Sequence, residues 1–411
     1  MPGKLYTRPR MHTLHDLESG ALHGARHVRL TWLGLTEFPR ALLELAPTLE
    51  VLDLSGNQLT TLPADFAQLR QLRIFFASSN PFSELPAVLG QCPQLEMIGF
   101  KACRIAHVPA PSLPARLRWL ILTDNQITHL PDALGQRPRL QKLMLSCNQL
   151  STLPDLSACH RLELLRIASN QFTAVPDTLL TLPSLAWPAL AGNPMTLKSE
   201  QQVLANQGHE AYLMQDLEQH ELLGEGASGH IYRVTHRPDG QALALKLFKA
   251  AATSDGTPQS ELAGGLAAGR HPHLLTPLAR VNTGPHQRLA MALPLLPQGY
   301  VSLAGPPSFD SCTRDVYDPE LRFSPDMGQR LLDAISSAVR HLHARDVLHG
   351  DLYAHNILWH PATGHAMLSD LGAAMLLDEL PRATAAQLKA MECRALQHLR
   401  SEVQARCTIP A

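Results

Sequence analysis

The sequence predicts an α/β chain in two parts, a solenoid of short repeats followed by a two-lobed α+β domain. In the first half, an asparagine or cysteine recurs every 22 or 23 residues within a leucine-rich frame. The second half holds a glycine-rich turn between β-rich stretches and, later, a polar Asp-to-Asn loop that follows an amphipathic stretch. A chain of 411 residues is long enough for two or three domains that each bury a core.

Composition excludes several classes of partner. The net charge is −1, so nothing in the charge favours nucleic acid or an anionic membrane as the main partner. The seven cysteines are odd in number and form no Cys-x-x-Cys pair, which indicates reduced thiols. The N-terminus lacks the apolar run of a secretory signal, and no stretch is long enough for a transmembrane helix. We therefore expect a soluble cytoplasmic protein with no nucleic-acid partner and no membrane insertion.

The repeat is defined by the frame Leu-x-x-Leu-x-Leu-x-x-Asn/Cys-x-Leu, as in residues 49–59. The turn positions are Asn57, Asn80, Cys103, Asn125, Asn148, Asn170 and Asn193. A proline follows each of the first six by six residues. We expect the leucines to fill the interior, the asparagines to satisfy backbone groups at the turn and the prolines to stiffen the return. No repeat buries its apolar face alone, so the array depends on stacking between neighbours.

This pattern resembles the leucine-rich repeat family, in the form that has Leu-Pro after the Asn turn. We predict an N-terminal cap over residues 1–27, repeats over 28–195, a junction helix within 196–215 and a second domain over 216–411. Cys103 is interpreted as an alternative turn ligand in preference to a reactive thiol.

The residues between the leucines of each strand are expected to face the concave surface. They are Val51, Asp53, Ile74, Phe76, Met97, Lys101, Trp119, Ile121, Lys142, Met144, Leu164, Arg166 and Trp187. Large apolar side chains beside Lys and Arg predict a strip that binds a protein partner. The alternative is that flanking loops or the second domain cover this strip.

The glycine-rich turn of the second half has the pattern Gly-x-Gly-x-x-Gly at Gly224, Gly226 and Gly229. Dinucleotide-binding folds share this pattern, but there the loop must enter a helix. Here residues 231–235 are β-rich and end in a turn at residues 236–240, so a hairpin is favoured. The backbone amides of such a hairpin can close over the phosphates of ATP, and Lys246, on the same face as Ala244, can reach them.

Glu261 lies fifteen residues after Lys246, at the start of a helical stretch. It is the natural ion-pair partner to hold Lys246 in place. The alternative is a solvated glutamate at a helix N-terminus, where negative charge is favourable.

Three residues of the polar loop carry the chemistry. Asp351 and Asn356, five residues apart, fit one tight loop after a helix predicted over Ser324–Arg345. Asp370, fourteen residues beyond Asn356, can return across a short hairpin to the same metal ion. Oxygen ligands around Mg²⁺ beside a carboxylate base are what phosphoryl transfer from ATP requires. The alternative is a polar loop that happens to contain Asp and Asn.

From about residue 217 onward, the sequence resembles the eukaryotic-type protein kinases. The resemblance implies Asp351 as catalytic base, with Lys246 and Glu261 as the phosphate-positioning pair, and Asn356 and Asp370 as Mg²⁺ ligands. It implies an ATP site made by Leu223, Gly224, Glu225, Gly226, Ala227, Ser228, Gly229, Ile231, Ala244 and Lys246.

The whole chain resembles bacterial leucine-rich repeat protein kinases. The implied activity is ATP- and Mg²⁺-dependent transfer to a protein hydroxyl, with Ser or Thr favoured over Tyr as the acceptor. The implied role of the repeats is to recruit the partner. A nucleotide-binding pseudokinase scaffold and a small-molecule phosphotransferase are the alternatives.

Several positions depart from the kinase pattern. Gly350 stands where regulated kinases have Arg, so no pocket for a phosphorylated activation loop is expected. Thr384 is the only hydroxyl residue between Leu371 and Met391, and no Ala-Pro-Glu follows. Tyr353 and His355 match neither Ser/Thr nor Tyr kinases. We expect Glu392 to begin the helix under the catalytic loop and the lobe to be shortened at its C-terminal end.

Overall fold

The computed structural model describes residues 11–206, 211–226, 228–249, 253, 255–284 and 288–407. The predictions that lie outside these residues are Ala227, the first ten residues of the cap, residues 207–210 of the junction, and residues 250–252, 254, 285–287 and 408–411 of the second domain. The chain forms two compact units, one of residues 1–144 with 148–161 and one of residues 145–147 with 162–411.

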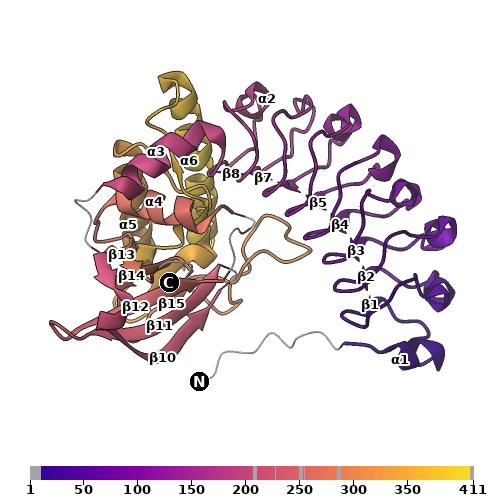
Figure 1. The fold of residues 1–411 in the computed structure, drawn as a ribbon, viewed down its shortest axis with the longest axis horizontal. Helices are drawn as coiled ribbons and strands as arrows, with labels where there is room; N and C mark the ends of the chain where they lie inside the picture. Colours follow the sequence, from indigo (N-terminus) through magenta and orange to yellow (C-terminus); the bar gives the residue numbers. More distant parts are fainter. Residues whose placement is uncertain are drawn as a thin grey trace. The chain divides into compact units, whose positions relative to one another are not determined.

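The first unit is built on short parallel strands, one from each repeat (Figure 1). They are β1 (His27–Arg29), β2 (Val51–Asp53), β3 (Ile74–Phe76), β4 (Met97–Gly99), β5 (Trp119–Ile121) and β6 (Lys142–Met144). Each strand pairs in register with the next, as Val51 does with Ile74. A short helix, α1 (Leu14–Glu18), precedes them and is capped by the Thr13 side chain. The predicted repeat solenoid is confirmed.

The return segments are 3₁₀-helices that each begin directly after a proline. They are η1 (Arg40–Leu45), η2 (Ala64–Gln68), η3 (Ala87–Gln91), η4 (Ala110–Ser112) and η5 (Asp132–Gln136). Proline fixes φ near the helical value, so each return starts in a defined direction. Between the strands and the returns lie the repeat leucines and a row of fully buried rings from Phe66, Phe75, Phe100 and Phe82.

The turn asparagines bind the backbone of two neighbouring repeats. Asn125 donates to the carbonyls of Phe100 at 2.8 Å and Leu122 at 3.0 Å, and accepts from the amide of Ile105 at 2.9 Å. At the equivalent position, the Cys103 thiol lies 3.6 Å from the Ala77 carbonyl, and burial raises the pKa of this thiol to about 11. This geometry agrees with a turn residue and not with a reactive thiol.

The second unit begins with the last strands of the repeat pattern. β7 (Leu164–Arg166) and β8 (Trp187–Ala189) form a parallel pair, with α2 (Asp177–Leu180) between them. The helix α3 (Pro194–Ala205) follows at once, and Figure 1 shows it beside α4 (Pro258–Ala268).

The smaller lobe of this unit is a six-stranded sheet with α4 packed against it. Its order is β10 (Leu217–Glu225), β11 (Gly229–His236), β12 (Gln241–Phe248), β14 (Ala290–Pro294), β13 (Ala279–Asn282) and β9 (Ala211–Leu213). A short 3₁₀-helix, η6 (Met214–Asp216), joins β9 to β10. The glycine-rich turn therefore joins two antiparallel strands, which excludes the dinucleotide-binding alternative.

The larger lobe holds the predicted catalytic loop, residues 349–356. Helix α5 (Pro325–Ala344) begins after Ser324, whose hydroxyl accepts from the Met327 amide at 3.3 Å. The elements that follow are β16 (Val347–Leu348), η7 (Ala354–Asn356), β17 (Ile357–Trp359), β18 (Ala366–Leu368), η8 (Leu371–Ala373), β19 (Met375–Leu376) and α6 (Arg382–Gln404). β15 (Val301–Ser302) pairs with β17, and β16 with β19.

The start of α6 differs from the expectation. The helix begins at Arg382, ten residues before Glu392, because Pro381 serves as its N-cap and good helix formers follow. Thr384, expected in a loop, therefore lies in the first turn of α6.

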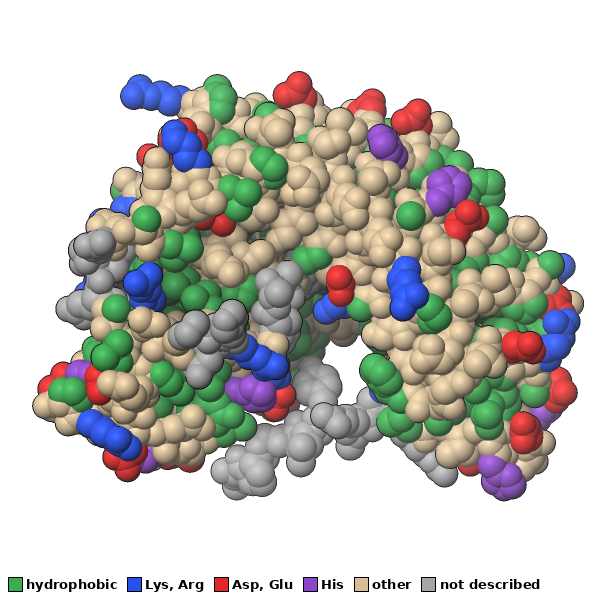
Figure 2. Space-filling view, viewed as in Figure 1, with side chains coloured by type: hydrophobic (Ala, Val, Ile, Leu, Met, Phe, Trp, Pro, Cys, Tyr) green, Lys and Arg blue, Asp and Glu red, His purple; other side chains and the backbone are tan. Residues whose placement is uncertain are grey.

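None of the described helices is long and apolar enough to cross a membrane. On the face drawn in Figure 2, acidic and basic side chains are scattered, without a field of one sign.

We predict that Asn125→Ala lowers the free energy of unfolding of the first unit by about 2–3 kcal/mol, because buried carbonyls lose their donor. Hydrogen–deuterium exchange of the peptides around residues 100–127 should rise. Gln126→Ala, at an exposed neighbouring position, is the control and should change little. Cys103→Asn should slow exchange, because the amide adds the missing hydrogen bonds. Equal exchange in Asn125→Ala and wild type would contradict this account of the turn.

Candidate active site

Lys246 and Glu261 form a buried ion pair at the centre of the smaller lobe. Lys246 lies in β12 and Glu261 in the first turn of α4, and both are almost fully buried. Burial raises the pKa of Glu261 to about 7, although the charge of Lys246 opposes this shift. The predicted pair is therefore formed, and the alternative of a solvated helix-start glutamate is wrong.

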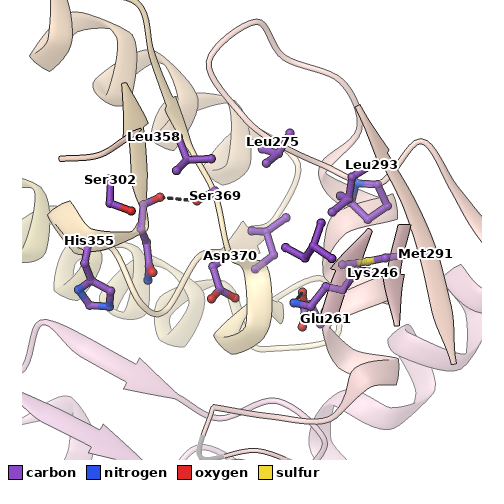
Figure 3. Close-up of a pocket in the computed structure, with 14 residues that line it drawn as sticks. Lys246, Glu261, Leu275, Met291, Leu293, Ser302, His355, Leu358, Ser369 and Asp370 are labelled. Atoms are coloured by element: carbon purple, nitrogen blue, oxygen red, sulfur yellow. Dashed lines mark hydrogen bonds and ion pairs between the residues drawn. The ribbon is translucent and has the colours of Figure 1, made fainter. Parts of the chain in front are cut away.

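This pair lines a cavity of about 250 Å³ between the two lobes (Figure 3). The other polar groups in its wall include Asn356 and Asp370. Apolar side chains from both lobes complete the wall, among them Ile231, Met291, Leu293, Leu358 and Leu371. An apolar cavity with a few convergent charged groups is the usual form of a small-molecule site.

The glycine-rich turn is closed by its own backbone. The Gly226 amide donates to the Gly229 carbonyl at 2.9 Å, and the Lys249 amide donates to the Ser228 carbonyl at 3.0 Å. Gly224 and Gly226 have no atom within 4 Å of an added Cβ, so the backbone there is open to an incoming group.

Most of the other residues predicted for the ATP site do not line the cavity. Leu223 is exposed, and Glu225 pairs with Lys249 at the surface. Ala244 packs in the core cluster with Met291 and Leu293, two residues of the cavity wall. Among the predicted phosphate-loop and strand residues that the structure describes, only Ile231 and Lys246 line the cavity.

Asn356 and Asp370 present oxygen atoms suited to a metal ion. The Asn356 amide nitrogen donates to the Asp351 carbonyl and carboxylate, both at 2.9 Å. Its amide oxygen has no hydrogen bond among the described residues. Asp370 adopts a left-handed conformation with φ 59°, and one of its oxygens accepts from the Gly372 amide at 3.1 Å. Mg²⁺ is commonly held by one or two such oxygens together with substrate phosphates and water, so these residues fit it.

The side chains of His349 and Glu392 hold the predicted catalytic loop in place by hydrogen bonds. The His349 ring accepts from the Asp351 amide at 3.2 Å and donates to the Ser369 carbonyl at 3.0 Å, which ties the loop to the Asp370 turn. Glu392 of α6 accepts from the Gly350 amide at 2.8 Å. The expectation that the Glu392 helix lies under the catalytic loop agrees with this contact.

Asp351 does not line the cavity, because Arg166 covers its carboxylate. Arg166 Nη2 lies 2.6 Å from Asp351 Oδ1, and the same guanidinium also pairs with Asp255. Asp351 is only 7% exposed. Burial by itself would raise the pKa of Asp351, but Arg166, His355 and His349 together with the hydrogen bond from Asn356 outweigh burial and hold the pKa below its usual value.

The strand β8 packs against the same loop. The Trp187 indole N–H donates to the Leu352 carbonyl at 2.9 Å, and its ring stacks on Tyr353 with 4.3 Å between centroids. Leu164, Arg166 and Trp187 were expected on an open concave strip, but all three are buried. For these buried residues the interpretation as an open partner-binding strip is wrong, and at Arg166 and Trp187 the loop around Asp351 occupies the face.

Gly350 is required by this packing. Its φ is +77°, and an added Cβ would lie 2.5 Å from the Ala373 carbonyl oxygen and 2.9 Å from that of Pro188 in β8. No side chain fits there, which accounts for the absence of an arginine before Asp351.

Sequence reasoning missed the role of Arg166 at this loop, and also that of Asp315. The His355 ring bonds Asp315 at 2.8 Å. Burial would lower the pKa of His355, but the bond to Asp315 and the nearby carboxylates of Asp315, Asp351 and Asp370 together outweigh burial and raise the pKa. Arg166 lies 185 positions from Asp351, and no spacing signal links residues so distant in the chain.

We predict that Gly350→Ala destabilises the protein by about 3 kcal/mol or more, because backbone strain and collision add. Gly240→Ala is a matched control, since Gly240 has φ +74° and no atom within 4 Å of an added Cβ. It should cost only about 1 kcal/mol. Thermal unfolding of the two variants measures the difference. Equal losses would show that β8 does not press on the catalytic loop.

Comparison with known proteins agrees with both halves of this description. Residues 217–391 match the family model described as protein kinase domain. Residues 48–69 and 115–172 match two models described as leucine rich repeat.

Individual relatives match only parts of the chain. Serine/threonine-protein kinase SBK2 of Rattus norvegicus is 26% identical over 185 residues, which cover 45% of this chain and 46% of the relative. Leucine-rich repeat-containing protein 58 of Homo sapiens is 37% identical over 103 residues, which cover 23% of this chain and 28% of the relative.

A solved structure of a leucine-rich repeat protein from Leptospira interrogans matches with a TM-score of 0.35 and 25% identity, over 40% of this chain and 48% of that chain. The chain spans less than half the length of the curated relatives it matches. On the family matches and the fold, the chain carries leucine-rich repeats followed by a protein kinase domain.

Proposed function

We propose that this chain is an ATP-dependent protein kinase that transfers the γ-phosphate to a Ser or Thr hydroxyl of a protein. The observation that carries the proposal is one cavity lined by the Lys246–Glu261 ion pair, Asn356 and Asp370. The assignment to proteins and to Ser or Thr is supported by the similarity to serine/threonine-protein kinases. ATP as substrate and the absence of a membrane-spanning helix among the described residues support action in the cytoplasm.

Each residue of the site has its own proposed role in phosphoryl transfer. Lys246, held by Glu261, binds the ATP phosphates from the smaller lobe. Asn356 and Asp370 hold Mg²⁺, which neutralises charge on the phosphates when it is bound. Asp351, fixed by Asn356 and the backbone around His349, orients the acceptor hydroxyl and takes its proton.

We further propose that the concave face of the first unit recruits the protein partner, as in leucine-rich repeat kinases of the bacterial type. Phe76, Trp119, Ile121 and Met144 on β3 to β6 keep part of their surface in solvent. Lys142 lies over the Trp119 ring with 4.1 Å to the centroid. Aromatic and Met side chains are enriched at the centres of protein interfaces.

A nucleotide-binding scaffold that transfers no phosphate is the second candidate. The observation that favours it is the burial of Asp351 beneath Arg166. A base without access to an acceptor would leave nucleotide binding as the only function of the cavity.

We predict that Asp351→Asn retains Mg²⁺–ATP binding and lowers turnover by a factor of about 10³ or more, because the base and hydroxyl-orienting group is lost. Asp370→Ala should weaken binding of the metal–nucleotide complex itself. Labelled ATP with lysate proteins measures turnover, and calorimetry measures binding. Wild-type turnover in both variants would overturn the kinase assignment, and binding without any turnover in the wild type would favour the scaffold.

We predict that Trp119→Asp combined with Met144→Asp abolishes phosphorylation of a protein partner and leaves ATP hydrolysis unchanged. Two buried contacts would be lost at the docking face, whereas the phosphate site lies in the second unit. Asp132→Asn, on a return segment of the first unit, serves as the control and should change neither rate. Equal partner phosphorylation by the double variant and the wild type would show that the repeats have another role.

A further inference from the structure

Arg166 lies between two carboxylates, those of Asp351 and Asp255. Its guanidinium bonds Asp351 at 2.6 Å and pairs with Asp255, and its side chain is 8% exposed. Asp255 in turn lies against the turn that follows Asp370, with its Cβ 3.8 Å from an added Cβ on Gly372. The guanidinium thus contacts the proposed base directly, and through Asp255 it is linked to the turn that follows Asp370.

The catalytic segment itself supplies no strong cation. Residues 349–372, from His349 to Gly372, contain neither Lys nor Arg. Lys246, paired with Glu261, lines the cavity from the smaller lobe, where the proposed function assigns it to the ATP phosphates. A transferring phosphoryl group spreads negative charge over its oxygens and needs preorganised positive charge close to the acceptor.

We infer that Arg166 is a further catalytic residue, a cation that the last repeats contribute in cis to the γ-phosphoryl group. This inference rests on the proposed kinase function. In the step, the acceptor oxygen forms a bond to the γ-phosphorus, and the bond from that phosphorus to the bridging oxygen breaks. ADP leaves with the electron pair, and Asp351 takes the hydroxyl proton. Arg166 binds oxygens of the group in transfer.

The guanidinium has one N–H donor that the two ion pairs leave unused. Its Nε is buried and has no hydrogen-bond partner among the described residues, although Arg has five N–H donors in a planar fork. A planar fork suits phosphate oxygens better than the point charge of Lys. Strand pairing of β7 with β8, and the packing of Trp187 on the catalytic loop, hold Arg166 in this place.

The same contacts would also suit an autoinhibitory role, here called a lock, in which Arg166 keeps the acceptor away from Asp351. The two roles predict opposite effects when Arg166 is removed. A catalytic cation makes the variant slower, whereas a lock makes it faster.

The test compares the full-length wild type with Arg166→Met, Arg166→Lys and the control Arg161→Met. Arg161 is an exposed arginine five positions earlier. Two quantities are measured with Mg²⁺: kcat and KM for phosphate transfer, and the ratio of affinities for a non-hydrolysable ATP analogue and for ADP. The affinity ratio reports a contact with the γ-phosphate without requiring turnover.

We expect Arg166→Met to lower kcat by a factor of 10² to 10³ and to lose most of the preference for the ATP analogue over ADP, while ADP affinity changes little. Arg166→Lys should keep part of both. Should Arg166→Met fail to fold, as judged by circular dichroism, Arg166→Lys decides through the same two measurements.

Two results would overturn the inference. Unchanged or faster turnover in Arg166→Met or Arg166→Lys, with an unchanged affinity ratio, would identify the contact as structural or as a lock. A wild type that binds nucleotide but transfers no phosphate would overturn the proposed function and the catalytic role of Arg166 together. The behaviour of the wild type thus separates the two failures.

Discussion

The second unit depends on the burial of Arg166 against Asp351 and Asp255. A buried guanidinium is costly unless carboxylates compensate it, and removing one partner of such a pair typically costs about 3–5 kcal/mol. The strand that carries Arg166 is therefore held on the catalytic loop as long as both carboxylates are ionised and in place. Its neighbour Trp187 adds a stacked ring and a hydrogen bond to the same loop.

This packing explains the departures of the catalytic loop from the kinase pattern. Gly350 has no side chain because Pro188 and Ala373 approach its backbone closely. The loop obtains its rigidity from other directions instead, through Glu392 of α6 and through the His349 ring. An arginine before Asp351 would have no room beside these two residues.

The end of the repeats also contacts the helix that carries Glu261. Glu200 of α3 accepts from the Ser260 hydroxyl at 2.8 Å, next to Glu261 in α4, and from the Gly192 amide at 2.9 Å. Residues of the last repeats and of the helix after them therefore support both sides of the cavity, the ion pair in the smaller lobe and the aspartate in the larger one. Within this unit, the repeats act as part of the kinase domain.

Features that depend on short spacing along the chain could be predicted from the sequence alone. The repeat period, the glycine hairpin, the partnership of Lys246 with Glu261 and the loop from Asp351 to Asn356 all follow from residues close together in the chain, where periodicity and turn chemistry act locally. The hydrogen bond between Arg166 and Asp351, which are 185 positions apart, could be found only in the folded chain. The alternation of side chains along a strand predicts which face of the sheet each side chain lies on. It does not predict whether that face is exposed to solvent or covered by a loop, so the sequence could not show that residues of the last repeats are buried.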